Sequence, residues 1–204
     1  MRRGILLLAV FLCATAWAQR VVSARAGMIH YLEGRVLLDG KRIVQNPNRF
    51  RQMSNGQTLT TSPRARAELM LNPTTYLRVG ESSAIKLLSD DLLDTRVELL
   101  TGAAIVDVRE LGNGNRVTLE MGGSAIEFRK SGIYQLATET GGRVRVYEGE
   151  AFVGSLKISR GWQVILGAEP AKFDRKDTDS LYHWSEQRAR VLGPPVVPHW
   201  PVLN

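Results

Sequence analysis

The sequence predicts an all-β protein: a β-sandwich or β-roll of about a dozen short strands, followed by a short C-terminal helix. Three observations between Val21 and Leu166 predict this class. Val, Ile, Leu and Thr alternate with charged or small residues, glycine interrupts the pattern at short intervals, and no long helical period occurs. The 204 residues, 44% hydrophobic and 23% charged, suit a globular chain of one domain or two small ones.

The first 18 residues have the pattern of a secretory signal peptide. A basic start at Arg2 and Arg3 precedes an uncharged run over 4–16, and a small-x-small site predicts cleavage between Ala18 and Gln19. The alternative is an uncleaved membrane anchor, although a spanning helix needs ~20 apolar residues. We therefore expect an exported protein, periplasmic or extracellular, with no transmembrane segment after cleavage.

A β domain is expected over residues 19–168. Its clearest strand is Arg143–Tyr147, in which Val144 and Val146 share one face, whereas Ala65–Leu71 alternates less strictly. A strand-glycine-strand pattern occurs around Gly34, Gly102 and Gly149, without a solenoid period; it suits stacked β-turn-β units or any antiparallel protein. Tight hairpin turns are predicted where residues that adopt positive φ cheaply stand in pairs: Asp39-Gly40, Asn55-Gly56, Asn113-Gly114 and Gly141-Gly142.

After residue 168 the pattern changes to a linker and an amphipathic helix, together predicted over 169–192. The helix is expected over Thr178–Val191, with Asp177 or Thr178 as its N-cap and Gly193 as its end. Residues 193–204 hold four prolines and predict an extended, flexible tail.

Two tryptophans are candidate partner contacts. Trp184 shares one helix face with Leu181 and Val191, so it either docks the helix on the β domain, which we favour, or anchors a partner. Trp200, in the proline-rich tail, is the other candidate partner contact, because extended proline-rich segments lose little entropy on binding.

The predicted strands, in this order, resemble the FecR domain, a periplasmic module, over residues 26–166. The best-marked stretch is Gly56–Leu69, where a turn precedes a strand rich in Ala and Leu, and Tyr76–Gly80 and Val144–Ala151 resemble later strands. The resemblance implies the β fold and an exported location.

Two departures from the family pattern bear on function. Regulatory family members have a cytoplasmic anti-sigma segment and a spanning helix before the periplasmic domain, where this chain has only Met1–Ala18. The segment Arg129–Tyr134 lacks the threonine of the family's Arg-Gly-Thr-x-Phe pattern. The resemblance therefore does not carry anti-sigma signalling over to this chain.

Residues with catalytic or metal-binding chemistry are few and scattered. Cys13, the only cysteine, lies in the predicted signal peptide, and the three histidines fall in separate segments. The sequence shows no motif that pairs a nucleophile with a base, so we expect neither an enzyme nor a cofactor or metal site. The acidic residues Asp90, Asp91 and Asp94 form either a Ca²⁺ site or a solvated loop, and the lack of calcium-loop spacing favours the loop.

The formal net charge is +7, and arginine is concentrated in the first third of the chain. A basic face attracts anionic lipid, lipopolysaccharide or acidic glycan. The alternative, which we favour, is that arginine on the solvent-exposed side of a strand protects a sheet edge from aggregation. Without an aromatic stacking motif, nucleic acid is not an expected partner. Among these arginines are Arg20, Arg25, Arg42, Arg49, Arg51, Arg64 and Arg66.

Together these features predict an exported, non-enzymatic β domain that acts as a protein-interaction, envelope-sensing or scaffold module. Its expected partner is another envelope protein or polymer, bound by strand addition at a free sheet edge or through the Trp200 segment. The alternative is a module that binds envelope glycan or wall polymer, and a hydrolase of envelope material is less favoured.

Overall fold

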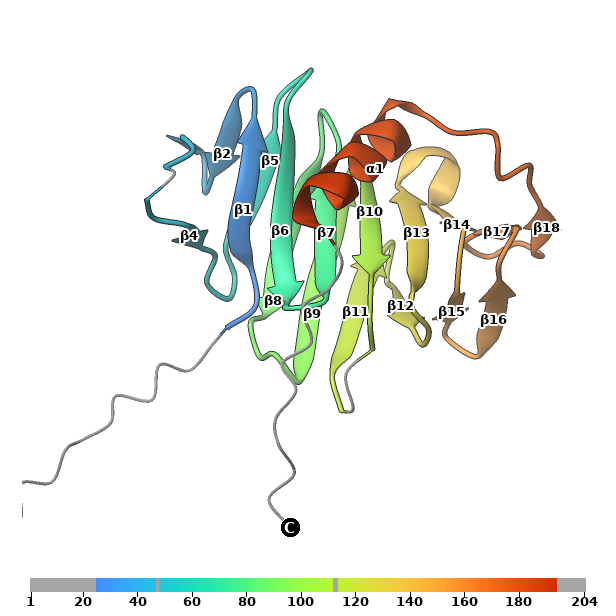
Figure 1. The fold of residues 1–204 in the computed structure, drawn as a ribbon. Helices are drawn as coiled ribbons and strands as arrows, with labels where there is room; N and C mark the ends of the chain where they lie inside the picture. The colour runs from blue at the N-terminus through green and yellow to red at the C-terminus, as the bar shows by residue number, and fades with distance from the viewer. Residues whose placement is uncertain (1–24, 47, 112–113, 194–204) are drawn as a thin grey trace, which may run out of the picture.

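Two nine-stranded β-sheets lie face to face in the computed structural model, which describes residues 25–46, 48–111 and 114–193 (Figure 1). The predicted all-β class with one C-terminal helix is confirmed. Sheet A has the order β18 (Ala171–Lys172), β17 (Trp162–Ile165), β14 (Arg143–Val146), β13 (Gly132–Ala137), β10 (Ala103–Val108), β7 (Thr75–Val79), β6 (Arg66–Asn72), β1 (Met28–Glu33), β4 (Arg51–Gln52). Sheet B has the order β16 (Leu156–Ser159), β15 (Glu150–Val153), β12 (Ser124–Phe128), β11 (Arg116–Met121), β9 (Asp94–Thr101), β8 (Ala84–Ser89), β5 (Thr58–Thr61), β2 (Val36–Leu38), β3 (Lys41–Ile43).

The described residues form eighteen strands, where about a dozen were predicted. Two of them, β4 and β18, have only two residues and are too short to show a period of two in the sequence. The strand β18 also lies inside 169–192, the segment predicted to hold only a linker and a helix.

The chain crosses between the two sheets as it advances along the sandwich. It forms the hairpin β6–β7 in sheet A, crosses to β8–β9 in sheet B, returns for β10, and continues in this way to β18. In Figure 1 the colours therefore run from blue to orange along the length of both sheets. Neighbouring strands are antiparallel except β9 and β11, which are parallel because β10 of the opposite sheet intervenes between them.

The inner faces of the sheets form one hydrophobic core. The predicted alternation in Arg143–Tyr147 is confirmed, since Val144 and Val146 are both fully buried there. Burying a side chain of this kind stabilises a fold by about 1.5–3 kcal/mol. Other core residues from the two sheets include Leu59, Leu69, Leu77, Val106 and Leu119.

The three strand-glycine-strand segments are crossings between sheets. Gly34 links β1 to β2, Gly102 links β9 to β10, and Gly149 lies between β14 and β15. At Gly102 the backbone has φ +82°, and a Cβ atom would lie 2.1 Å from the Ser83 Oγ. Only glycine fits this crossing, because a side chain would clash in addition to straining the backbone.

Three of the four predicted turns occur where they were expected, but not all of them are hairpins. Asp39-Gly40 joins the paired strands β2 and β3. Gly141 is the last residue of the short 3-10 helix η1 (Glu139–Gly141), and Gly142 follows it, between the paired strands β13 and β14. Asn55-Gly56 is a turn without a hairpin, because β4 and β5 lie in different sheets. Asn113 lies outside the described residues.

The helix α1 (Ser180–Leu192) lies across the outer face of sheet A (Figure 1). Its N-cap is Asp179, not the predicted Asp177 or Thr178, since the Asp179 Oδ1 accepts a hydrogen bond of 2.8 Å from the Tyr182 amide. Gly193 ends the helix as predicted.

The face of α1 that is buried against sheet A differs in part from the predicted face. Leu181 and Trp184 are buried as expected, but Val191 is 72% exposed. The buried face is centred on Leu181 and Arg188, and Val191 lies at its side in the last turn. In the described ranges, no helix is both long enough and apolar enough to cross a membrane.

Candidate functional site

Three charged side chains lie side by side on the outer face of sheet A, beneath α1. Glu68, Arg78 and Asp107, on the neighbouring strands β6, β7 and β10, are at most 4% exposed. The Arg78 Nε donates to Glu68 Oε2 and the Arg78 Nη1 to Asp107 Oδ2, both at 2.8 Å. We call these three residues the ion cluster. The strand register places Glu68 directly opposite Arg78, so the sheet itself aligns the first pair.

The helix α1 completes the ion cluster from above. The Ser185 Oγ accepts a hydrogen bond of 2.8 Å from Arg78 Nη1, and Arg188 Nη2 donates to Glu68 Oε1 at 2.9 Å. Arg109, which follows β10, donates to the carbonyl of Ala189 at 2.8 Å, near the C-terminal end of the helix, where cations are favoured. The helix is therefore fixed by charge as well as by apolar contact.

The ion cluster keeps Glu68 ionised. Burial raises the pKa of Glu68, but hydrogen bonds from His30, Arg188 and Arg78 outweigh burial and lower this pKa to about 2. A carboxylate with so low a pKa is a poor general acid or base near neutral pH. The cluster is thus suited to positioning α1 and not to proton transfer.

The apolar part of the helix interface contains Trp184. Trp184 and Leu181 pack on Ile105 of sheet A, and the Trp184 Nε1 donates to Glu33 Oε2 at 2.9 Å. With 5% exposure, Trp184 docks the helix within its own chain, which is the favoured sequence interpretation. A partner contact through Trp184 stays a prediction, and it would require α1 to move.

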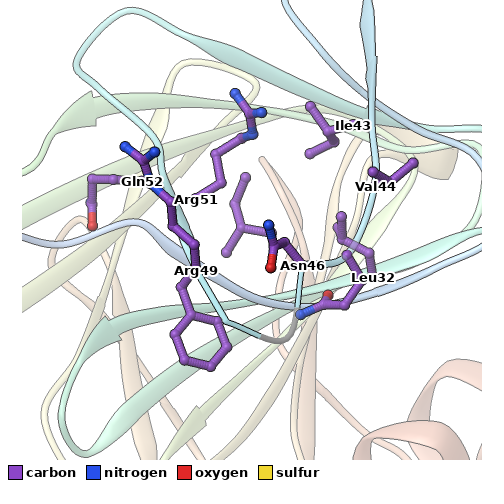
Figure 2. Close-up of a pocket in the computed structure, with 10 residues that line it drawn as sticks. Leu32, Ile43, Val44, Asn46, Arg49, Arg51 and Gln52 are labelled. Atoms are coloured by element: carbon purple, nitrogen blue, oxygen red, sulfur yellow. The ribbon is translucent and has the colours of Figure 1, made fainter.

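An open groove lies at the N-terminal end of the sandwich, between β1, β3 and β4 (Figure 2), with a volume of about 520 Å³. Figure 2 shows Ile43 and Val44 on one side of the groove and Arg49 and Arg51 on the other. Val44 is 71% exposed and Phe50, also in the lining, is 46% exposed. We call this hollow the basic groove, lined among others by Leu32, Ile43, Val44, Arg49, Phe50 and Arg51.

The edge of β1 is open along the basic groove. The strand β4 pairs with β1 only at Met28 and Ile29, although β1 continues to Glu33. On that side, no strand in the described part of the chain pairs with the rest of β1. The His30 carbonyl there accepts a hydrogen bond of 3.3 Å from the side-chain amide of Gln45. An unpaired strand edge of this kind accepts an added strand.

The positive charge of the basic groove is not compensated. No lining residue is acidic. Arg49 and Arg51 have no ion-pair partner among the described residues, and the residues outside the description contain neither Asp nor Glu. Arg51 on β4 and Arg42 on β3 are exposed on edge strands, which is where edge protection places arginine.

His30 connects the basic groove to the ion cluster. Its ring stacks on Phe50 with 5.3 Å between ring centroids and an interplanar angle of 29°. Its Nδ1 lies 2.9 Å from Glu68 Oε1. The half-exposed Phe50 therefore rests on a side chain that is itself held by the buried ion cluster.

The acidic residues and histidines flagged in the sequence do not meet. Asp90 pairs with Arg25 at 3.3 Å and Asp94 with Arg96 at 3.5 Å, while His183 lies on α1. Across the described ranges, no three His, Cys, Asp or Glu side chains gather as metal ligands would. Asp90 and Asp91 lie in the connection between β8 and β9, and Asp94 is the first residue of β9.

The aromatic residues do not share one open face in the part of the chain that the structure describes. Tyr134 is fully buried in the core. The ring centroid of Tyr31 lies 6.4 Å from that of Trp184, beside α1. Trp162, 37% exposed, lies on β17 at the other end of sheet A. The predicted cleavage residues Ala18 and Gln19 and the tail residue Trp200 lie outside the described residues, so these predictions stay open.

The basic groove and the ion cluster were not predicted as sites.

Residues 57–152 match the family model described as "FecR protein". Two solved structures of a "putative anti-sigma factor" from Parabacteroides distasonis have a TM-score of 0.46 and are 13% and 12% identical to this chain. The match covers 57% of this chain and 59% of each of those chains, so it spans little more than half their length. Among curated proteins, none matches this sequence.

Proposed function

We propose that the chain, whose residues 57–152 match the FecR family model, is an exported, non-catalytic recognition module that binds another protein of the cell envelope. The family match supports a sensing or signalling domain. The signal-peptide pattern of residues 1–18 supports export.

The chemistry of the buried residues supports binding over catalysis. Every charged side chain of the ion cluster is neutralised by a partner within hydrogen-bond distance, and Glu68 holds a pKa of about 2. Such a cluster stabilises the fold and places α1, and a carboxylate with the low pKa of Glu68 is a poor general acid or base near neutral pH.

The basic groove is the observation that carries the proposal. It combines exposed apolar side chains, Val44 and Phe50, with two unpaired arginines at an open strand edge. Large exposed apolar side chains rimmed by polar ones mark interaction sites. Because no open face gathers the aromatic side chains of the described residues, a protein partner is favoured over a glycan.

The test is site-specific photo-crosslinking in living cells. A photoreactive phenylalanine analogue replaces Phe50 in the basic groove, and in a matched control it replaces Trp162 at the other end of sheet A. We expect position 50 to cross-link to one discrete envelope protein and position 162 not to do so. N-terminal sequencing of the same material should begin at Gln19. Unprocessed protein in the cytosol, or a polymer adduct in place of a protein adduct, would contradict the proposal.

A further inference from the structure

We infer that the basic groove binds an acidic, extended segment of a partner protein, which pairs with the open edge of β1 as an added strand. This inference rests on the proposed function and adds the chemistry of the partner. Three features of the groove carry it: the open backbone, the charge and the exposed apolar side chains.

The backbone of β1 offers the hydrogen bonds. The edge strand β4 covers two of the six residues of β1 and leaves the stretch from His30 to Glu33 without a strand on that side. The basic groove runs along this stretch, and Leu32 is part of its lining. Strand addition uses main-chain hydrogen bonds for affinity and pockets at alternate side chains for specificity.

The charge of the groove selects an acidic strand. Arg49 and Arg51 are two residues apart, both are exposed, and both lie on the same side of the groove (Figure 2). An extended peptide repeats its side-chain direction every two residues, so carboxylates at alternate positions match this spacing. Arginine binds carboxylates with two parallel hydrogen bonds, which adds geometric specificity.

The apolar side chains complete the specificity. Val44 and Phe50 are exposed, and the stacking of Phe50 on His30 fixes its ring before a ligand arrives. Residues between the carboxylates of a bound strand point the other way, so an apolar residue there would meet this surface. The expected ligand alternates acidic and apolar residues.

The same charges disfavour other occupants. A second copy of this chain would bring its own arginine-bearing edge strands β3 and β4 to the contact, and like charges repel. Residues 194–204 contain no acidic side chain and do not supply the expected carboxylates.

The experiment measures fluorescence anisotropy of labelled eight-residue peptides with the full chain purified after export. The probes are an alternating Asp-Val peptide, an alternating Lys-Val peptide, and an Asp-Val peptide N-methylated along one backbone edge. The variants are Arg49→Glu with Arg51→Glu and, as a control with the same change in charge, Arg160→Glu with Arg175→Glu, both exposed at the far end of the sandwich.

We expect the Asp-Val peptide alone to bind, and the groove variant to weaken binding by about tenfold or more while the control variant does not. N-methylation should abolish binding, because it removes the main-chain donors. Hydrogen exchange should slow, when the peptide binds, at those amides of His30–Glu33 that face the open edge and not β6.

Three results would overturn the inference: no binding of the Asp-Val peptide, equal weakening by both variants, or equal binding of the N-methylated peptide. Concentration-dependent self-association that the groove variant abolishes would assign the groove to a second copy instead. If these tests fail while position 50 still cross-links to an envelope protein, the strand inference is wrong and the proposed function stands. If the peptide binds but position 50 cross-links to no envelope protein, the groove binds an acidic strand and the proposal of an envelope-protein partner is wrong.

Discussion

Replacing Arg78 by methionine tests whether the ion cluster fixes the packing of α1 on sheet A. The side chain is fully buried and donates three hydrogen bonds of 2.8 Å, to Glu68, Asp107 and Ser185. Without it, the one ion-pair partner that Asp107 keeps among the described residues is Arg109, at 3.5 Å. We expect the free energy of unfolding to fall by about 3–5 kcal/mol, the usual cost of removing one partner from a buried ion pair.

Urea unfolding followed by far-ultraviolet circular dichroism measures this loss. The matched control is Arg96→Met, which removes an ion pair with Asp94 at 3.5 Å whose side chains are 50% and 40% exposed. Exposed pairs contribute about 0–1 kcal/mol, so the control should unfold almost as the unaltered protein does. If Arg78→Met lowers the free energy of unfolding no more than the control does, the ion cluster does not stabilise the fold as argued.

Three further predictions concern stability. Trp184→Ala should lower the free energy of unfolding by about 3–5 kcal/mol because it empties a buried site; an unchanged Tm would argue against docking of the helix. Gly102→Ala should cost about 2 kcal/mol or more, because the new Cβ meets Ser83, whereas Gly40→Ala has open space and should cost only about 1 kcal/mol from its positive φ; equal costs would refute the steric argument. Glu68 ionises with a pKa of about 2 in place of 4.5. Its ionisation therefore adds about 3 kcal/mol to the free energy of unfolding, which is complete above pH 4.5 and lost as the pH falls toward 2. Glu68→Gln should therefore be less stable at pH 7 and lose less stability over that interval, and parallel pH profiles would contradict this assignment.

The fold class could be predicted from the sequence because the patterns that indicate it lie within short segments. The alternation in Arg143–Tyr147 gave a strand with a buried face, and the predicted helix over 178–191 differs from Ser180–Leu192 by no more than two residues at either end. The FecR resemblance is confirmed over residues 57–152. Very short strands such as β4 escaped prediction, since two residues carry no period.

The ion cluster and the basic groove could not be predicted from the sequence, because segments far apart in the chain form them. Glu68, Arg78 and Asp107 each stand between apolar residues of their strands, which is also the ordinary pattern of a strand with one face in water. They are buried only because α1, more than 70 residues later in the chain, returns over sheet A and adds Ser185 and Arg188.

The sequence by itself determined the β class, the turns, the C-terminal helix and the excess of positive charge, since each follows from neighbouring residues. The tertiary structure alone decided which charges are paired and which strand edge is open. Arginines that look alike in the sequence divide into Arg78, which is buried and paired with Glu68 and Asp107, and Arg49 and Arg51, which are exposed beside the open edge of β1. The physical reason is that the energy of a charge depends on its surroundings, and segments far apart in the chain supply those surroundings.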